Sequence, residues 1–222
     1  MGSVWTRRSW APVLGAVLLG AGTTACGGGE SQESPRYVAA SEVCDGVFRA
    51  RAAAAVERLM GVGPYGNTGR GAVERVADAL RDGYESGRSW TRATRLCSLE
   101  PKGTGIGEHA SLRFSIYAPG DIGTGGLAEG ERAYRMGTEA EAGPGGARLY
   151  FECVSHRLKG SSERPARVFG GLSLASDLKE DSKEHREAGL TVVHAASLAV
   201  AEELECEDRG GLPEKPVLVE AD

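Results

Sequence analysis

Residues 147–156 read Ala-Arg-Leu-Tyr-Phe-Glu-Cys-Val-Ser-His and give a strong strand signal, because apolar and polar side chains alternate along most of the stretch. Successive side chains of a strand point to opposite faces of a sheet, so Leu149, Phe151 and Cys153 are expected to face a core. Arg148 and Tyr150 then belong to the opposite face. A sheet with one buried face needs helices to cover it, so the fold class depends on where helices occur.

Further strands are expected on both sides of this stretch. Residues 110–117 and 166–174 alternate in the same way, and their inward side chains are Leu112, Phe114 and Ile116 in the first and Val168, Leu172 and Leu174 in the second. A strand over 92–99 would place Ala93, Cys97 and Leu99 on one side. Between 119 and 146 the chain is rich in glycine, and only 131–136 resembles a strand. Residues 216–219 are expected to add a short edge strand.

Helices are expected at both ends of the strand region. The first would begin at Ser41 as N-cap and run to about Met60, where glycines and Pro64 end it. The second covers 71–85, with apolar residues at helical spacing. The last begins near Asp181, three residues before Glu184 as in a capping box, and 188–201 is nearly all apolar, which is typical of a buried helix. This order predicts an α+β domain: an antiparallel sheet with helices packed on one face.

The cysteines predict covalent cross-links. Cys44 and Cys97 are 53 residues apart, and so are Cys153 and Cys206. Each pair joins a helical segment to an inward position of a strand, which favours the disulfides Cys44–Cys97 and Cys153–Cys206 and a fold with two disulfides. Four cysteines allow three connectivities, and the sequence leaves the other two open. The alternative use, a zinc site, would need cysteines closer together than any pair here.

The outward positions of the predicted strands form a candidate binding face. They carry arginine and aromatic side chains, which could bind an anion, a sugar or a partner protein: Arg113, Tyr117, Arg148, Tyr150, Arg167 and Phe169. The alternative is an ordinary solvated face of an antiparallel sheet, where such residues are common.

The N-terminus resembles an export signal. Arg7 and Arg8 precede an apolar stretch over 11–22 that is too short to span a bilayer. Ala25-Cys26 then matches a bacterial lipobox, although Thr23 stands where an aliphatic residue is usual. We therefore expect a signal peptide over 1–25, lipid attachment at Cys26, a flexible tether over 26–38 and a single domain over 39–222. Ordinary cleavage after Ala25 is the alternative, and Arg7-Arg8 leaves the twin-arginine route open beside the general one.

The odd number of cysteines favours lipid attachment. The chain has five, and exported proteins rarely keep an odd thiol, so a lipidated Cys26 would leave an even number to pair. Removing 1–25 takes away Arg7 and Arg8 and moves the net charge from −5 to −7. This acidic balance argues against nucleic-acid binding.

No catalytic, metal or cofactor motif stands out, so no catalytic residue, metal ligand or cofactor is assigned. The stretch 103–107 lacks the Gly-Lys-Ser/Thr end of a phosphate loop. The histidines fit no metal motif, and His194 in the last helix is expected to be buried with a hydrogen-bond partner. The acids Glu139 and Glu141 fall in the glycine-rich region and are interpreted as solvated loop residues, as are Glu180, Asp181 and Glu184.

Several segments together resemble lipoproteins of actinobacteria. They are Ala25-Cys26, Val-Cys-Asp-Gly-Val over 43–47, Arg-Ala-Tyr-Arg-Met-Gly over 132–137, Tyr-Phe-Glu-Cys-Val over 150–154 and the run 194–204. The resemblance implies export and anchoring at the extracytoplasmic face of the cell membrane, but no activity. The leading hypothesis is a non-enzymatic module that binds an envelope protein or a small ligand. A secreted hydrolase with an unrecognised site and a purely structural envelope protein are the alternatives.

Overall fold

A computed structural model describes residues 37–66, 71–103, 110–122 and 126–221. The predicted signal peptide, Cys26 and most of the tether lie outside these residues, as do His109 and most of the glycine-rich stretch 103–107.

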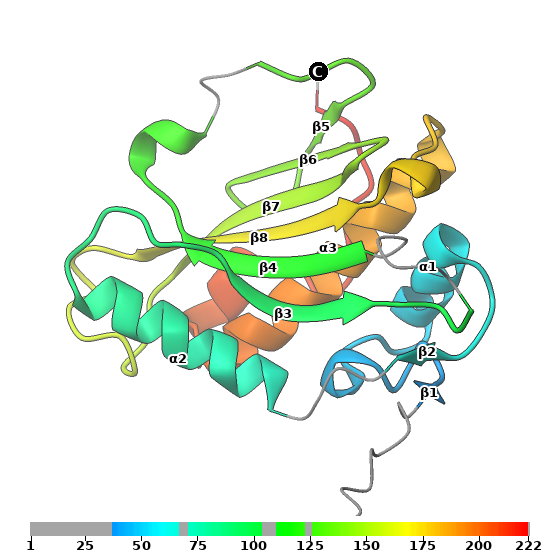
Figure 1. The fold of residues 1–222 in the computed structure, drawn as a ribbon. Helices are drawn as coiled ribbons and strands as arrows, with labels where there is room; N and C mark the ends of the chain where they lie inside the picture. Colours follow the sequence, from blue (N-terminus) through cyan, green and yellow to red (C-terminus); the bar gives the residue numbers. More distant parts are fainter. Residues whose placement is uncertain (1–36, 67–70, 104–109, 123–125, 222) are drawn as a thin grey trace, which may run out of the picture. The chain divides into compact units, whose positions relative to one another are not determined.

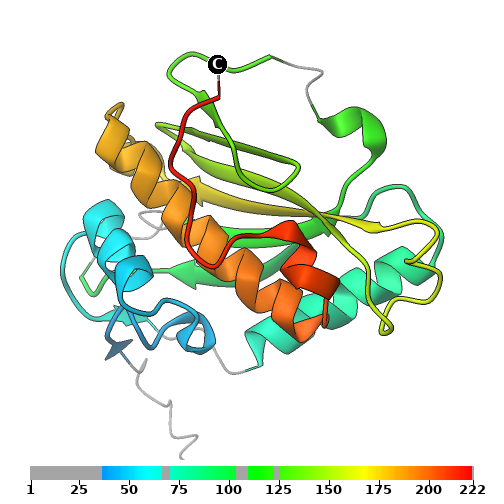
Figure 2. The same cartoon turned by 180° about the vertical axis from the view of Figure 1, so that it is seen from behind.

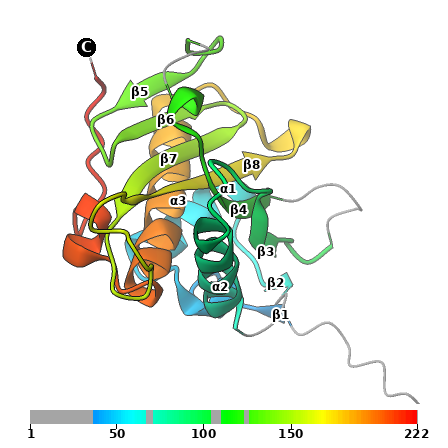
Figure 3. The ribbon, with the colours of Figure 1, turned by 90° about the vertical axis from the view of Figure 1, so that its left-hand side faces the viewer.

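The described residues form the predicted α+β fold. A six-stranded antiparallel sheet has the order β3-β4-β8-β7-β6-β5, which can be followed from strand to strand in Figures 1 and 3. The strands are β3 (Thr94–Leu99), β4 (Ala110–Ile116), β5 (Arg132–Tyr134), β6 (Glu139–Gly143), β7 (Gly146–Cys153) and β8 (Ala166–Leu174). A separate two-stranded sheet joins β1 (Tyr37–Val38) to β2 (Tyr65–Gly66).

The inward faces of the three strongest strands are as predicted. Leu112, Phe114, Leu149, Phe151 and Val168 are all fully buried. β8 spans the predicted residues, and it lies between β4 and β7 as a central strand. Burial of one face fixes the side-chain period along each strand, and this explains why alternation alone located them.

Among the described residues, two helices cover the buried side of the sheet and a third packs on one of them. α2 (Ala72–Glu85) packs on β3 and β4, α3 (Lys183–Glu203) crosses β6, β7 and β8, and α1 (Arg51–Met60) packs on α3 (Figure 2). α3 approaches the sheet closely because both surfaces are small there: a Cβ on Gly189 would lie 3.4 Å from that of Ala147. No helix among the described residues is long and apolar enough to cross a lipid bilayer.

The predicted start of the first helix was wrong, and the N-cap of the last helix differs by one residue from the predicted one. The first helix begins at Arg51 rather than at Ser41, because Cys44, Asp45 and Ala50 have positive φ angles of 54°, 64° and 44° and interrupt the helical path. At α3, which begins near Asp181 as predicted, the N-cap is Ser182, whose Oγ accepts a hydrogen bond from the amide of His185 at 3.2 Å, and this single cap replaces the capping box predicted at Asp181.

Two corrections concern the strands. β6 lies in the region expected to contain only one strand, and it was missed because its buried residues are only the small Ala140, Ala142 and Gly143. In β3 a bulge between Arg95 and Cys97 breaks the alternation predicted for 92–99. Cys97 and Leu99 are buried as expected, but Ala93 precedes the strand and is exposed.

The last residues pair with β5, near where an edge strand was predicted. Arg135 N donates to Val219 O at 3.0 Å and Ala221 N donates to Ala133 O at 2.9 Å. The predicted strand over 216–219 is therefore only a short bridge, centred on Glu220 opposite Tyr134. Even so, it covers an edge that would otherwise expose unpaired amides and carbonyls.

Both predicted disulfides are present. Cys44–Cys97 ties the segment before α1 to β3, with Cα atoms 5.5 Å apart, and Cys153–Cys206 ties the end of β7 to the chain after α3, at 5.1 Å. All four cysteines are buried. Because the four sulfur atoms pair with each other, no thiolate among them is left for the alternative zinc site.

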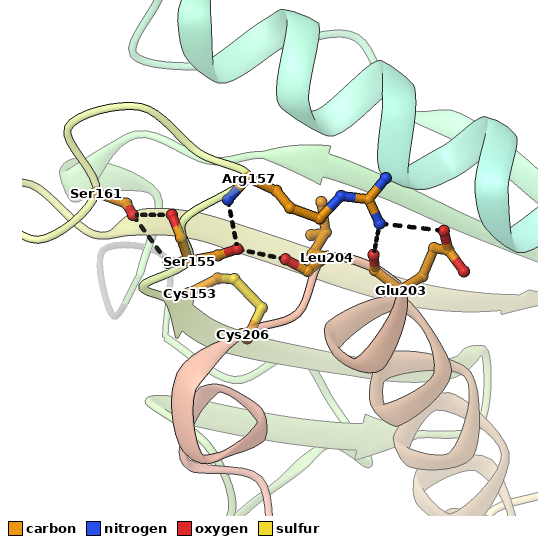
Figure 4. Close-up of a disulfide and its surroundings, with 7 residues drawn as sticks. All are labelled: Cys153, Ser155, Arg157, Ser161, Glu203, Leu204 and Cys206. Atoms are coloured by element: carbon orange, nitrogen blue, oxygen red, sulfur yellow. Dashed lines mark hydrogen bonds and ion pairs between the residues drawn. A yellow bond between two sulfur atoms is a disulfide. The ribbon is translucent and has the colours of Figure 1, made fainter.

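Hydrogen bonds reinforce the second disulfide (Figure 4). The Ser155 hydroxyl donates to the carbonyl of Leu204 at 2.5 Å, and the Arg157 guanidinium donates to the carbonyl and, at 3.3 Å, to the carboxylate of Glu203. A helix leaves its last carbonyls without partners, and a cation near them is favourable. The loop after β7 therefore caps the C-terminus of α3 beside Cys153–Cys206.

Candidate binding pocket on the outer face of the sheet

Strand register places the predicted binding-face residues on the uncovered side of the sheet. Across β4, β8 and β7, Arg113 lies opposite Gly171 and Gly171 opposite Arg148. In the next row Phe169 lies opposite Tyr150, and in the third the Tyr117 amide donates to the carbonyl of Arg167 at 3.1 Å. Sequence periodicity thus grouped these residues correctly, but their side chains do not form one uniform surface.

The aromatic side chains pack against each other instead of facing solvent. The ring centroids of Tyr117 and Tyr150 are 5.1 Å apart in an edge-to-face arrangement, and Tyr150 and Phe169 are also 5.1 Å apart. Tyr117 is 4% exposed and Tyr150 is 8% exposed. The Phe169 ring lies over Gly171, where a Cβ would come within 2.6 Å of it. This part of the face is therefore a small second core.

The arginine nearest these rings is held by two carboxylates. Arg148 Nε lies 2.6 Å from Glu141 and its Nη2 lies 2.8 Å from Glu131. Burial alone would raise the pKa of Glu131, but hydrogen bonds from the Ala128 amide and from Arg148 outweigh it and lower the pKa. Arg148 is thus bound by two carboxylates of the same chain, and they offset its positive charge.

A pocket of about 450 Å³ opens beside Arg148 and Tyr150. Its lining residues come from strands β5, β6 and β7 and from described residues between β4 and β5. The other lining residues are Asp121, Gly126, Leu127, Ala133, Glu139 and Glu141. We call this the outer-face pocket. Its position on paired strands gives the lining side chains a rigid base.

The sequence interpretation missed the acids of the outer-face pocket. Glu139 and Glu141 were expected in a loop, but they lie on β6 and are half-buried, with Ala140 and Ala142 on the opposite face. The Glu-Ala-Glu-Ala alternation over 139–142 was the available signal. Asp121 follows β4 in a short helical turn and carried no comparable pattern.

Tyr150 lines the outer-face pocket, and its side chain is nearly buried. Burial raises the pKa of the phenol; Arg148 opposes the rise, while Glu141, Glu139 and Asp121 add to it. The hydroxyl therefore stays protonated at neutral pH and lies in a field with three nearby carboxylates.

The remaining predicted arginines lie away from the outer-face pocket. Arg167 is 3.8 Å from Glu152 in a partly exposed ion pair. Arg113 is exposed and has no ion-pair partner in the described part of the chain; it lies opposite Arg95 on β3. Strict alternation would have turned Arg95 inward, and the bulge after it turns it to the outer face.

A larger groove of about 1040 Å³ runs along the side of α3 that faces away from the sheet. The start of α1, the start of α2 and residues 214–216 complete it. Its two buried polar side chains already have partners: His194 Nε2 lies 2.8 Å from the carbonyl of Pro213, and Thr191 donates to that of Glu187 at 2.7 Å. His194 is thus buried with a hydrogen-bond partner, as predicted. Neither of the two buried polar side chains described in this groove lacks a partner.

His194 predicts a pH-dependent stability. Burial lowers its pKa below the usual 6.5, and the hydrogen bond to Pro213 only partly opposes this. Between the two pKa values His194 is protonated in the unfolded chain and neutral in the folded chain. Its contribution to the free energy of unfolding is therefore complete above about pH 6.5 and is lost as the pH falls through the lowered pKa. The slope is at most about 1.4 kcal/mol per pH unit for one proton.

We expect the variant His194→Gln to reduce this dependence, because glutamine keeps an N–H donor for Pro213 and does not titrate. Urea unfolding of both proteins at pH 7 and pH 5 measures the difference. An equal loss of stability in the two proteins on acidification would contradict the assignment to His194.

Nothing among the described residues suggests a metal centre: no three His, Cys, Asp or Glu side chains lie close enough to hold a metal ion. Comparison with known proteins found no match among protein-family models, curated proteins or solved structures. The fold and the outer-face pocket are therefore the basis for a functional proposal.

Proposed function

We propose that this protein is an exported lipoprotein, anchored by a lipid on Cys26, whose domain over 39–222 binds a ligand or an envelope protein through the outer-face pocket. The observation that carries the proposal is the pairing of Cys44 with Cys97 and of Cys153 with Cys206. Of the five cysteines in the chain, it leaves Cys26 as the one without a partner.

Disulfide chemistry supports the extracytoplasmic location. Two buried structural disulfides suit an oxidising compartment, whereas the cytosol keeps thiols reduced. The basic start, the apolar stretch over 11–22 and Ala25-Cys26 supply the matching export and lipidation signals. A lipid with more than one acyl chain would give the stable membrane attachment that a single chain does not.

The outer-face pocket supports the binding half of the proposal. It is concave, it rests on paired strands, and the side chain of Tyr150 lines it beside several carboxylates. Small-ligand sites commonly combine such a concavity with a few polar groups. A ligand held there would sit at the face of the sheet opposite the helices.

Replacing Cys26 is expected to release the protein from membranes. In Cys26→Ser the membrane-bound fraction should fall by more than about tenfold, because the acyl chains provide the attachment. Fractionation of cells followed by immunoblotting measures it, and the intact mass of the native protein should correspond to a chain beginning at a lipidated Cys26. Alkylation without reduction should label no thiol.

Thr23→Leu is the matched control, since it alters the same signal but supplies the aliphatic residue usual in a lipobox. It should remain at the membrane. If Cys26→Ser stayed at the membrane like the unaltered protein, or if native protein carried no lipid, the anchoring proposal would fail.

A further inference from the structure

Trp90, in the connection between α2 and β3, is the most exposed aromatic side chain among the described residues, at 62%. The neighbouring Thr91 holds this connection against the sheet: its amide donates to the carbonyl of Ile116 at 3.0 Å, and its Oγ1 accepts the amide of Ile116 at 3.0 Å. On the other side, a Cβ on Gly83 of α2 would lie 2.6 Å from the methyl group of Thr91. The exposed ring is therefore attached to a fixed part of the fold.

Exposed arginines accompany Trp90 at the β3–β4 edge of the sheet (Figure 1). The stretch 86–99 holds three of them and no acidic residue, and β4 holds a fourth and no acidic residue. None of the four has an ion-pair partner in the part of the chain that the structure describes. We call these residues together the basic edge patch: Arg88, Trp90, Arg92, Arg95 and Arg113.

The charges of the basic edge patch do not stabilise the fold. Arg95 lies directly opposite Arg113 in the register of β3 and β4, and like charges in such a pair destabilise a sheet. At the other side of the sheet the opposed charges are complementary, since Arg148 lies opposite Glu141. The basic edge patch is thus a positive surface on a chain of negative net charge, and its electrostatic complement is an anionic partner.

We propose that the basic edge patch docks the domain on the surface of an anionic lipid bilayer. Guanidinium groups bind phosphate oxygens through paired hydrogen bonds, and basic residues are attracted to anionic headgroups. Tryptophan favours the headgroup level of a bilayer, where its ring leaves water and its N–H keeps a hydrogen-bond partner. The combination of four unpaired arginines with one exposed tryptophan matches both requirements of such a surface.

The short chain ahead of the domain supports a bilayer as the partner. This inference rests on the proposed lipid at Cys26, which is 11 residues before Tyr37, the first described residue. Eleven residues span at most about 40 Å even when fully extended. The domain is therefore held close to the lipid surface, and a contact that is weak by itself becomes effective. The basic edge patch shares no residue with the outer-face pocket, so docking and ligand binding are separate properties.

Trp90 reports directly on the proposed contact. The other two tryptophans of the chain, Trp5 and Trp10, lie in the predicted signal peptide. The test uses the oxidised chain 26–222 with Cys26→Ser, which contains all the described elements, and vesicles of phosphatidylcholine with or without phosphatidylglycerol. Lipid is added up to roughly 10 mM, because four arginines should give binding at about the millimolar level.

Vesicles that contain phosphatidylglycerol should move the Trp90 emission to shorter wavelength, and brominated acyl chains should quench it. Phosphatidylcholine alone should do neither. At about 1 M NaCl the Debye length is about 3 Å, so the effect should disappear. Poly-L-glutamate, which carries negative charge without lipid, is the probe for an acidic protein as the partner.

Variants locate the contact, with vesicle flotation as the measurement. Arg95→Gln with Arg113→Gln should weaken binding roughly 25-fold, about fivefold for each arginine. Trp90→Ala should weaken it about fivefold or more. The matched control is Arg49→Gln with Arg51→Gln, which removes two exposed charges at the start of α1, on the helical side of the sheet. It should leave binding within about twofold. Thermal unfolding checks that each variant is folded.

Binding to the anionic vesicles that the patch variants weaken and the control does not would support the proposal. The proposal is overturned if these vesicles leave the Trp90 emission unchanged, if phosphatidylcholine binds equally well, or if the control loses as much binding as the patch variants. A response to poly-L-glutamate without a response to vesicles would assign the basic edge patch to an acidic protein instead. The vesicle experiment uses protein without a lipid on Cys26, so its result is independent of the fractionation experiment that tests anchoring.

Discussion

Replacing Cys153 and Cys206 together with alanine is expected to lower the free energy of unfolding by about 4 kcal/mol. The bond closes a loop of 53 residues' separation, and in the chain-entropy model its removal frees the unfolded chain by that amount. The loss is a large share of the stability of a typical domain. Urea unfolding of the oxidised double variant against the unaltered protein measures it.

The other disulfide provides an internal control. Cys44–Cys97 spans the same 53 residues, so the entropy model assigns it the same value. A larger loss at Cys153–Cys206 would report its coupling to the bonds of Ser155 and Arg157 at the end of α3. A loss below about 1 kcal/mol in both double variants would contradict a structural role for the cross-links.

Gly146→Ala is expected to lower the free energy of unfolding by more than about 3 kcal/mol, which would leave the fold only marginally stable. Gly146 begins β7 with φ at +137°, a conformation that residues with a side chain rarely adopt. A Cβ there would lie 1.9 Å from the carbonyl oxygen of Leu172 on β8. Relief of that contact requires the central pair β7–β8 to separate. Thermal or urea unfolding measures the effect.

The adjacent Gly145→Ala is the matched control for Gly146→Ala. A Cβ on Gly145 meets nothing closer than Lys179 Cε at 3.7 Å, an ordinary contact with a flexible side chain. Its effect should stay within about 1 kcal/mol. Comparable losses at the two positions would show that the turn tolerates a side chain at neither and that the contact with Leu172 is not the cause.

Periodicity identified the strands whose buried residues are large and missed the one whose buried residues are small. Leu149, Phe151 and Val168 differ strongly in hydrophobicity from their neighbours, whereas β6 buries only two alanines and a glycine. The bulge beside Arg95 is a backbone feature with no signature in residue type. Equal cysteine spacing, in contrast, led to the correct disulfides because each pair joined elements that do pack together.

Only some of the residues that line the outer-face pocket could be predicted from the sequence. Alternation placed Arg148 and Tyr150 on the same face, but which groups surround them depends on strand order. Once β6 pairs with β7, Glu141 lies opposite Arg148 and Glu139 lies opposite Tyr150. The sequence indicated an arginine-rich face that could bind an anion. Strand pairing instead places carboxylates beside Arg148, and this pairing cannot be predicted from local sequence.

The Cys44–Cys97 bond also determines how the domain would carry mechanical load. A pull on the chain ahead of Tyr37 first opposes the short pairing of β1 with β2. Once that pairing opens, the tension reaches Cys44 and passes through the sulfur atoms to Cys97 in β3. Residues 45–96, with α1 and α2, are then bypassed by the force. In the oxidised protein the tension therefore enters the main sheet at β3 without first unravelling the two helices.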